Sequence, residues 1–171
     1  MDGDVLERAT WTWALVLVAL TTAIHATGVV MMARAGVRLR LRLERRSLPL
    51  RGVIPIVVGV VAAVGLLLAV LHGIEATIWA AAYLWLGAFG APTDAILYSL
   101  GAMTTAGVSG LTLTGHWRIM SALESTGGAL LFGISTAYIF AVLQAYWPML
   151  SGRPTDAATG ARPGAGQEKL A

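Results

Sequence analysis

Three long apolar stretches, separated by polar breaks, dominate the pattern of the chain. They run from about Trp11 to Ala33, from about Val53 to at least Ile74, and from about Ile119 to Trp147. Each is long enough for a membrane-crossing helix, which needs roughly 20 apolar residues. The first also exceeds the roughly 7–15 residues of a signal-peptide core, which predicts a retained helix. The pattern therefore predicts an all-α protein with three transmembrane helices.

A shorter helix is expected between the second and third stretches. The second helix is predicted to reach about Leu86, and to tilt, protrude or break near Gly73, because it would overshoot a hydrocarbon core of ~30 Å. Residues 87–92 are typical of a turn, and Thr93 is a candidate N-cap. Residues 94–104 supply only about three helical turns, which predicts a re-entrant helix rather than a span.

Composition and charge agree with a membrane protein and give it an orientation. The chain is 57% hydrophobic and 12% charged. Seven arginines stand between Arg34 and Arg51 against a single Glu44. Short arginine-rich loops stay in the cytoplasm, so we expect the N-terminus outside, this loop inside, residues 98–110 outside and the C-terminus inside. The net charge of +3 is then no signal for nucleic acid, and anionic lipid is only a secondary candidate ligand of the loop.

Side chains suited to catalysis or metal binding are sparse. The chain has no cysteine, and it shows no nucleophile paired with a base, no phosphate loop and no carboxylate dyad, so an enzyme is not expected. The three histidines lack metal-ligand spacing, and His25 is predicted to be a packing residue. His72 and Glu75 share a helix face. They are either a functional ionisable group at membrane depth or, as we favour, a hydrogen-bonded pair that fixes the short helix.

The segment YSLGAMTTAGVSG at residues 98–110 carries the most distinctive chemistry. It resembles the selectivity filter of the potassium channel superfamily, which usually ends T-T-x-G-Y-G-D and in which backbone carbonyls replace an ion's hydration shell. The first half of the motif is present, at Thr104, Thr105, Ala106 and Gly107. The second half is not, because its Tyr, Gly and Asp positions hold Val108, Ser109 and Gly110.

A row of carbonyls pointing one way requires alternating backbone handedness. Gly107 accepts a left-handed conformation, whereas Ser109 in that conformation would cost about 1 kcal/mol. Val108 lacks the phenolic hydroxyl that usually braces the filter, and Gly110 removes an outer carboxylate. The alternative interpretation is a polar re-entrant turn that conducts nothing.

The flanking helices resemble those of bacterial two-helix pore proteins, in which the segment after the filter reads W-R-L-x-x-x-L-E-x-x-x-G-x-L-x-F-G-x-S-T. The matching residues are Trp117, Arg118, Leu123, Glu124, Gly128, Leu130, Phe132, Gly133, Ser135 and Thr136. The resemblance covers residues 53–147, which it implies to be a pore module of outer helix, pore helix, filter and inner helix. Outside it lie a peripheral transmembrane helix (1–33), the cytoplasmic arginine-rich loop (34–52) and a cytoplasmic tail (148–171) that is expected to be disordered.

The resemblance also implies roles for single residues. The filter would be formed by Thr104, Thr105, Ala106, Gly107, Val108 and Ser109. It would be supported by Glu75, Trp79, Tyr98 and Glu124, with Glu124 either pairing with Arg118 or bracing the filter from behind. Gly127, Gly128 and Gly133 are either a gating hinge or sites of close helix contact.

The expected function is passive cation flux through a homotetramer in the bacterial inner membrane. Potassium is the expected ion, with relaxed selectivity, and no cofactor beyond the permeant cation is implied. The alternative is a non-conducting membrane scaffold or regulatory subunit that retains the pore fold.

Overall fold

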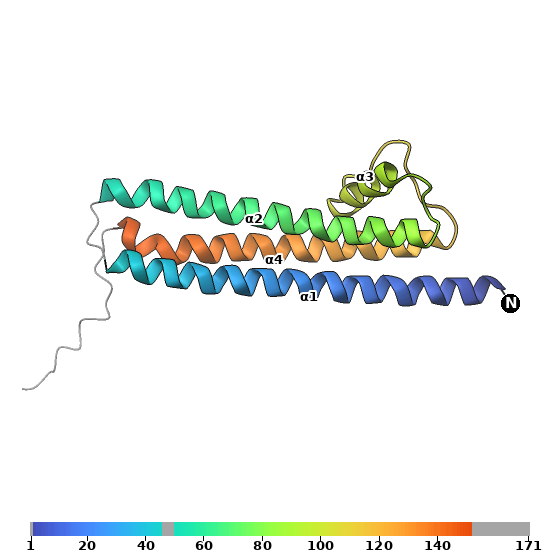
Figure 1. Ribbon diagram of the computed structural model, residues 1–171, viewed down its shortest axis with the longest axis horizontal. Helices are drawn as coiled ribbons and strands as arrows, with labels where there is room; N and C mark the ends of the chain where they lie inside the picture. Colours follow the sequence, from blue (N-terminus) through green and yellow to red (C-terminus); the bar gives the residue numbers. More distant parts are fainter. Residues whose placement is uncertain (1, 46–49, 152–171) are drawn as a thin grey trace, which may run out of the picture.

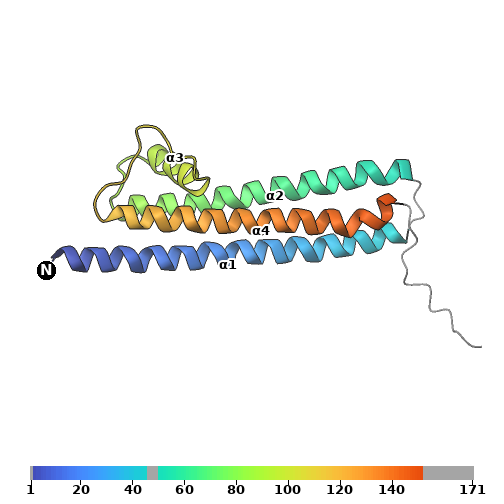
Figure 2. The same ribbon diagram turned by 180° about the vertical axis from the view of Figure 1, so that it is seen from behind.

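The computed structural model describes residues 2–45 and 50–151 of the chain. Within these residues the protein is all-α (Figure 1). The four helices are α1 (Asp2–Glu44), α2 (Leu50–Trp85), α3 (Pro92–Met103) and α4 (Trp117–Ser151). Helices α1, α2 and α4 lie side by side, and α1 and α4 run in one direction while α2 runs in the other (Figures 1 and 2). The short α3 packs on α2 and α4 at the end of the bundle where α1 begins.

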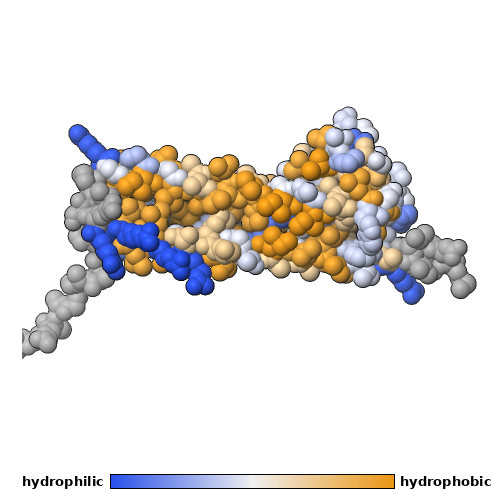
Figure 3. Space-filling model, viewed as in Figure 1, coloured by the Kyte–Doolittle hydropathy of each residue, from blue (hydrophilic) through white to orange (hydrophobic). Residues whose placement is uncertain are grey.

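Three of the helices are long and apolar enough to cross a membrane, within Glu7–Glu44, Arg51–Trp85 and Trp117–Ser151. This indicates a multi-pass membrane protein, as the apolar stretches predict. The surface agrees, because apolar side chains cover the middle of the bundle and hydrophilic ones gather toward its ends (Figure 3). Large apolar side chains such as Leu66 and Phe140 are 67% and 60% exposed. Such exposure suits lipid and is uncommon over large areas of a soluble monomer.

The long helices extend beyond the apolar stretches. Helix α1 continues to Glu44, so most of the arginines expected in a loop lie on its last turns. Arginine and leucine, which alternate there, both favour helix, and Arg40 Nε donates a 2.8 Å hydrogen bond to Glu44 Oε1 one turn later. The predicted break near Gly73 is wrong, because α2 is a single helix of 36 residues. Of the tail expected to be disordered, residues 148–151 belong to α4 and the rest lies outside the described residues.

Helix α3 begins at Pro92, and the prediction of Thr93 as its N-cap is wrong. The N-cap is Ala91, which has extended backbone and no side-chain capping bond. Proline favours the first helical position, since its fixed φ suits the helix and its missing N–H is not needed there. The proline therefore starts the helix two residues before the expected position.

The main apolar core lies beneath α3. It joins Trp79 and Tyr83 of α2, Tyr98 and Met103 of α3, and Met120 of α4. Helix α1, expected to be peripheral, contributes the buried Ala14 and Leu17 to the same core. A second, smaller cluster at the opposite end joins Val53, Val57 and Tyr146. Both ends of the bundle are thus packed, and α3 is fixed on the larger core.

Candidate functional site

The filter-like segment is the loop that follows α3 and leads toward α4. Thr104, Thr105, Ala106, Gly107 and Ser109 are exposed in the single chain, and Val108 is half-buried. The buried face of α3 ends immediately before it, at Met103. The loop therefore presents its backbone outward from a helix that is itself firmly packed.

The backbone of the loop alternates in handedness at its start. Thr105 has φ 57° and Gly107 has φ 66°, so two left-handed residues stand two positions apart. A positive φ is a genuine outlier for a β-branched residue such as threonine. Ser109, which would have to be left-handed for the alternation to continue, has no positive φ, and Gly110 with φ 81° takes that conformation instead. Glycine accepts it without a steric penalty, which is why the turn forms there.

Hydrogen bonds hold the two halves of the loop differently. The Gly107 amide donates to the Gly101 carbonyl of α3 over 3.0 Å, which ties the first half to the helix. The Leu111 amide donates to the Val108 carbonyl over 3.1 Å, which closes a tight turn over residues 108–111. The Val108 carbonyl is therefore engaged within the chain.

A cavity of about 410 Å³ separates the loop from α4. Thr105, Gly107 and Val108 line it on the loop side, and Arg118 and Ser121 line it on the α4 side. Val108 also covers Gly101, since a Cβ at Gly101 would lie 2.6 Å from the Val108 Cγ2. The space behind the loop is thus partly open, and the side chain at position 108 borders it.

Of the four predicted supporting residues, one lies on α3 and two lie on the helices that pack against it. Trp79 and Tyr98 belong to the main core, and the Tyr98 hydroxyl donates a short 2.5 Å hydrogen bond to Ser121 Oγ of α4. Glu124 is fully buried and accepts a 2.8 Å hydrogen bond from the Tyr83 hydroxyl of α2. The structure thus gives Glu124 a bracing position between helices, with Tyr83 as its hydrogen-bond donor rather than Arg118.

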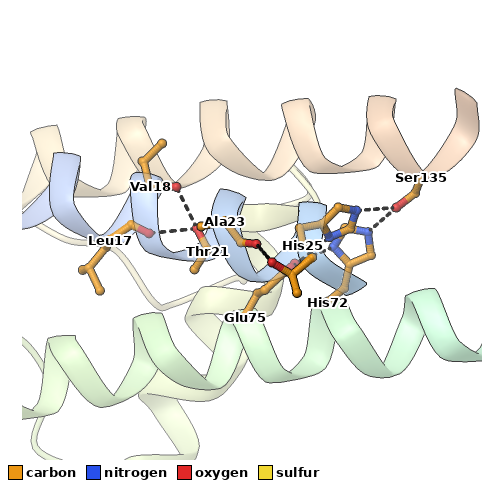
Figure 4. Close-up of polar contacts among 9 residues, drawn as sticks. Leu17, Val18, Thr21, Ala23, His25, His72, Glu75 and Ser135 are labelled. Carbon is orange, nitrogen blue, oxygen red and sulfur yellow. Dashed lines mark hydrogen bonds and ion pairs between the residues drawn. The ribbon is translucent and has the colours of Figure 1, made fainter. Parts of the chain in front are cut away.

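The fourth, Glu75, has partners away from the loop. Its carboxylate lies against His25 of α1 and His72 of α2, near the middle of the bundle (Figure 4). His25 is buried, as expected of a packing residue, but it also contacts Glu75 over 2.9 Å. The three side chains form a cluster whose ligand atoms lie within 4.8 Å of one another, which the spacing of the histidines did not indicate. Sequence spacing could not reveal this cluster, since His25 and Glu75 are 50 residues apart. The one available signal was the presence of ionisable residues inside apolar stretches.

The three candidate hinge glycines all lie on α4, which is continuous through these positions. Their surroundings differ. A Cβ at Gly128 would collide with the backbone of Met103, so this glycine permits close contact with the end of α3. Gly127 faces Val18 of α1 at an ordinary packing distance, and Gly133 has open space around it. Close helix contact is therefore realised at Gly128, and a hinge at the three positions stays a prediction.

Comparisons with protein-family models, with curated proteins and with solved structures gave no match to this chain.

Proposed function

We propose that the chain is one subunit of a passive cation channel whose filter is the loop at residues 104–109. The observation that carries the proposal is the positive φ of Thr105, two residues before the positive φ of Gly107. Strained backbone of this kind costs of order 1–3 kcal/mol and clusters at functional sites. Alternating handedness is what a row of carbonyls directed toward one axis requires. The position of the loop, after a short buried helix and between two long apolar helices, supports the same function.

One loop cannot enclose a pore, so the channel would be an oligomer, and the resemblance to potassium channels implies a homotetramer. Thr104, Thr105, Ala106 and Gly107 are all exposed in the single chain. Non-helical backbone is tolerated at membrane depth only when it is buried in protein or lines water. Four copies around an axis would meet this condition, with α3 as the re-entrant pore helix, α4 as the inner helix and α2 as the outer one. The resemblance to bacterial two-helix pore proteins implies the same assignment of pore, inner and outer helices.

Potassium is the proposed ion, with relaxed selectivity. Selectivity depends on the number of carbonyl ligands and on how firmly they are held. The first half of the loop is tied to α3 through Gly107, which favours ordered inner ligands. In the second half, the Val108 carbonyl accepts a hydrogen bond from Leu111, and Gly110 offers no carboxylate. An incomplete outer half would admit other monovalent cations.

The proposed location is the bacterial inner membrane, with the filter at the outer face. The arginines on the last turns of α1 lie at the end of the bundle opposite to α3. Positive residues favour the cytoplasmic side, so the filter loop would face outward and α4 would end inside.

One observation favours the alternative of a non-conducting scaffold or regulatory subunit. The turn over residues 108–111 directs the Val108 carbonyl to an amide of its own chain. If that turn persists in the assembly, the outer half of the loop binds no ion. A pore fold without flux would then serve as a membrane interaction module.

Replacement of single filter residues tests the proposal. Gly107→Ala should abolish potassium flux from reconstituted protein, because alanine resists a φ of 66°. Gly90→Ala is the matched control, since Gly90 lies in an exposed loop with a negative φ and open space around it. Val108→Tyr combined with Ser109→Gly should raise the potassium-to-sodium permeability ratio, because the cavity beside Val108 offers room for a phenol. Unchanged flux in Gly107→Ala and unchanged selectivity in the double variant would exclude this loop as the filter.

A further inference from the structure

Four polar side chains from three helices meet in the interior of the bundle. His25 of α1 lies 2.9 Å from Glu75 of α2, measured from Nδ1 to Oε1. His72 Nδ1 lies 3.2 Å from the other oxygen, Glu75 Oε2. On the far side of both rings, Ser135 Oγ of α4 lies 3.1 Å from His25 Nε2 and 3.2 Å from His72 Nε2 (Figure 4). The four side chains therefore form a closed ring of four polar contacts.

The four contacts of the ring need one more proton than the neutral side chains supply. Two neutral imidazoles supply two N–H protons, the serine hydroxyl supplies one, and an ionised carboxylate supplies none. Three protons cannot fill four contacts, so one contact brings two lone pairs together. The atoms His72 Nδ1 and Glu75 Oε2 are both buried without a hydrogen-bond partner, although they are only 3.2 Å apart. Two unpaired acceptors facing each other in a buried site are costly unless a cation lies between them.

The position of Ser135 makes both histidines available as ligands. Its hydroxyl oxygen has two lone pairs and can accept from the Nε2–H groups of both rings. In that arrangement each ring carries its proton on Nε2 and turns the lone pair of Nδ1 toward Glu75. A histidine that binds a metal typically donates its other ring N–H to such a partner, which fixes the tautomer and the ring orientation. Ser135 lies where that partner is needed for both rings at once.

The geometry points to a divalent transition-metal site formed by His25 Nδ1, His72 Nδ1 and the Glu75 carboxylate. The ligand atoms of the three residues lie within 4.8 Å of one another. Two imidazole nitrogens and one carboxylate are a donor set that zinc accepts in proteins, with a fourth position for water. Magnesium and calcium prefer oxygen ligands and should not compete. A proton on one imidazole would instead complete the fourth contact, and the binding experiment distinguishes the two.

The site would join α1 to the proposed pore module. His25 and Glu75 are fully buried, and the His72 side chain is only 13% exposed, so the three ligands lie inside the bundle. A metal bound to His25 and to the two α2 ligands would hold α1 against α2 near the middle of the bundle. The inference is independent of ion conduction, because none of its ligands belongs to the filter loop.

Zinc binding to the purified parent protein in detergent tests the site. The protein should be prepared without a histidine tag, and bound metal should be counted by equilibrium dialysis with elemental analysis. One Zn²⁺ per chain is expected, and excess Mg²⁺ should not displace it. X-ray absorption at the zinc edge should show two imidazole nitrogens and oxygen ligands at about 2.0–2.2 Å. This spectrum is recorded on the parent protein, so it decides the question even if the variants fail to fold.

Variants identify the ligands. His25→Gln, His72→Gln and Glu75→Gln should each remove binding, and Ser135→Ala should weaken it about 10- to 100-fold. The matched control is His116→Gln, which changes the third histidine of the chain, in the loop before α4, and should bind as the parent does. Equal binding by the folded His25→Gln variant would overturn the inference, as would a zinc spectrum without imidazole. A parent protein that binds no zinc but changes its stability with pH would also overturn it, in favour of a proton.

Discussion

Met103, the last residue of α3, lies directly against Gly128 of α4. A Cβ built at Gly128 would stand 2.7 Å from the Met103 Cα, which is closer than real Cβ atoms approach. The backbone of α4 thus contacts the end of the short helix α3, from which the loop at residues 104–109 emerges. The loop is positioned by this contact, because Thr104 follows Met103 directly.

Gly128→Ala should therefore destabilise the protein. The added methyl meets the backbone of Met103, which cannot move aside as a flexible side chain would, and overpacking of this kind costs about 1–3 kcal/mol. Thermal unfolding of the detergent-solubilised protein measures the effect. Gly133→Ala is the control, since nothing lies within 4 Å of its Cβ position, and in a helix it should be neutral or stabilising by up to ~1 kcal/mol. Equal stability of the two variants would contradict the close contact.

The hydrogen bond from Tyr83 to Glu124 predicts a second effect on stability. Tyr83→Phe removes the donor and leaves the buried Glu124 Oε2 unpaired, which should cost about 1–3 kcal/mol. Tyr138→Phe is the matched control, because that hydroxyl has no hydrogen bond within the described residues, and its effect should be under ~0.5 kcal/mol. Both are measured by the same unfolding experiment. If Tyr83→Phe is as stable as the control, the hydrogen bond from Tyr83 to Glu124 does not contribute to the stability of the protein.

The orientation of the chain can be measured by cysteine labelling, since the chain has no cysteine of its own. Thr114→Cys, in the exposed loop before α4, should react with an impermeant thiol reagent added to intact cells. Arg42→Cys, exposed on the last turn of α1, should react only after the membrane is opened. The reverse pattern would invert the topology and place the loop at the cytoplasmic face.

The apolar stretches were sufficient to predict the helices, but not all of their ends. Three long apolar segments and a short one between them gave four helices, because helix formation in lipid follows apolar length. The apolar pattern does not predict the extension of α1 to Glu44, because a run of charged residues is typical of a loop, although arginine and leucine favour helix. A capping side chain at Thr93 predicts a later start for α3 than the structure shows, because the helix begins at Pro92 without a side-chain cap.

The candidate site was predictable only where its residues are close in sequence. The left-handed Gly107 follows from a local motif, whereas Gly110 took the conformation expected of Ser109 through a turn that the motif did not include. Contacts between residues far apart in sequence could not be predicted. Tyr83 and Glu124 are 41 residues apart, and His25 and Ser135 are 110 apart. Contacts of that kind depend on how helices pack, and a single sequence does not specify that packing.

Ion flux from the purified parent protein in liposomes tests the central claim most directly. Native mass measurement should first establish that the purified protein is a tetramer. That form is then reconstituted, and potassium, sodium and chloride gradients are compared in the same preparation. Protein-free liposomes and the Gly107→Ala protein serve as controls for leak. We expect potassium flux, slower sodium flux and no chloride flux above these controls. A folded tetramer that passes no cation, or one that passes chloride as readily as potassium, would contradict the proposal of a cation channel.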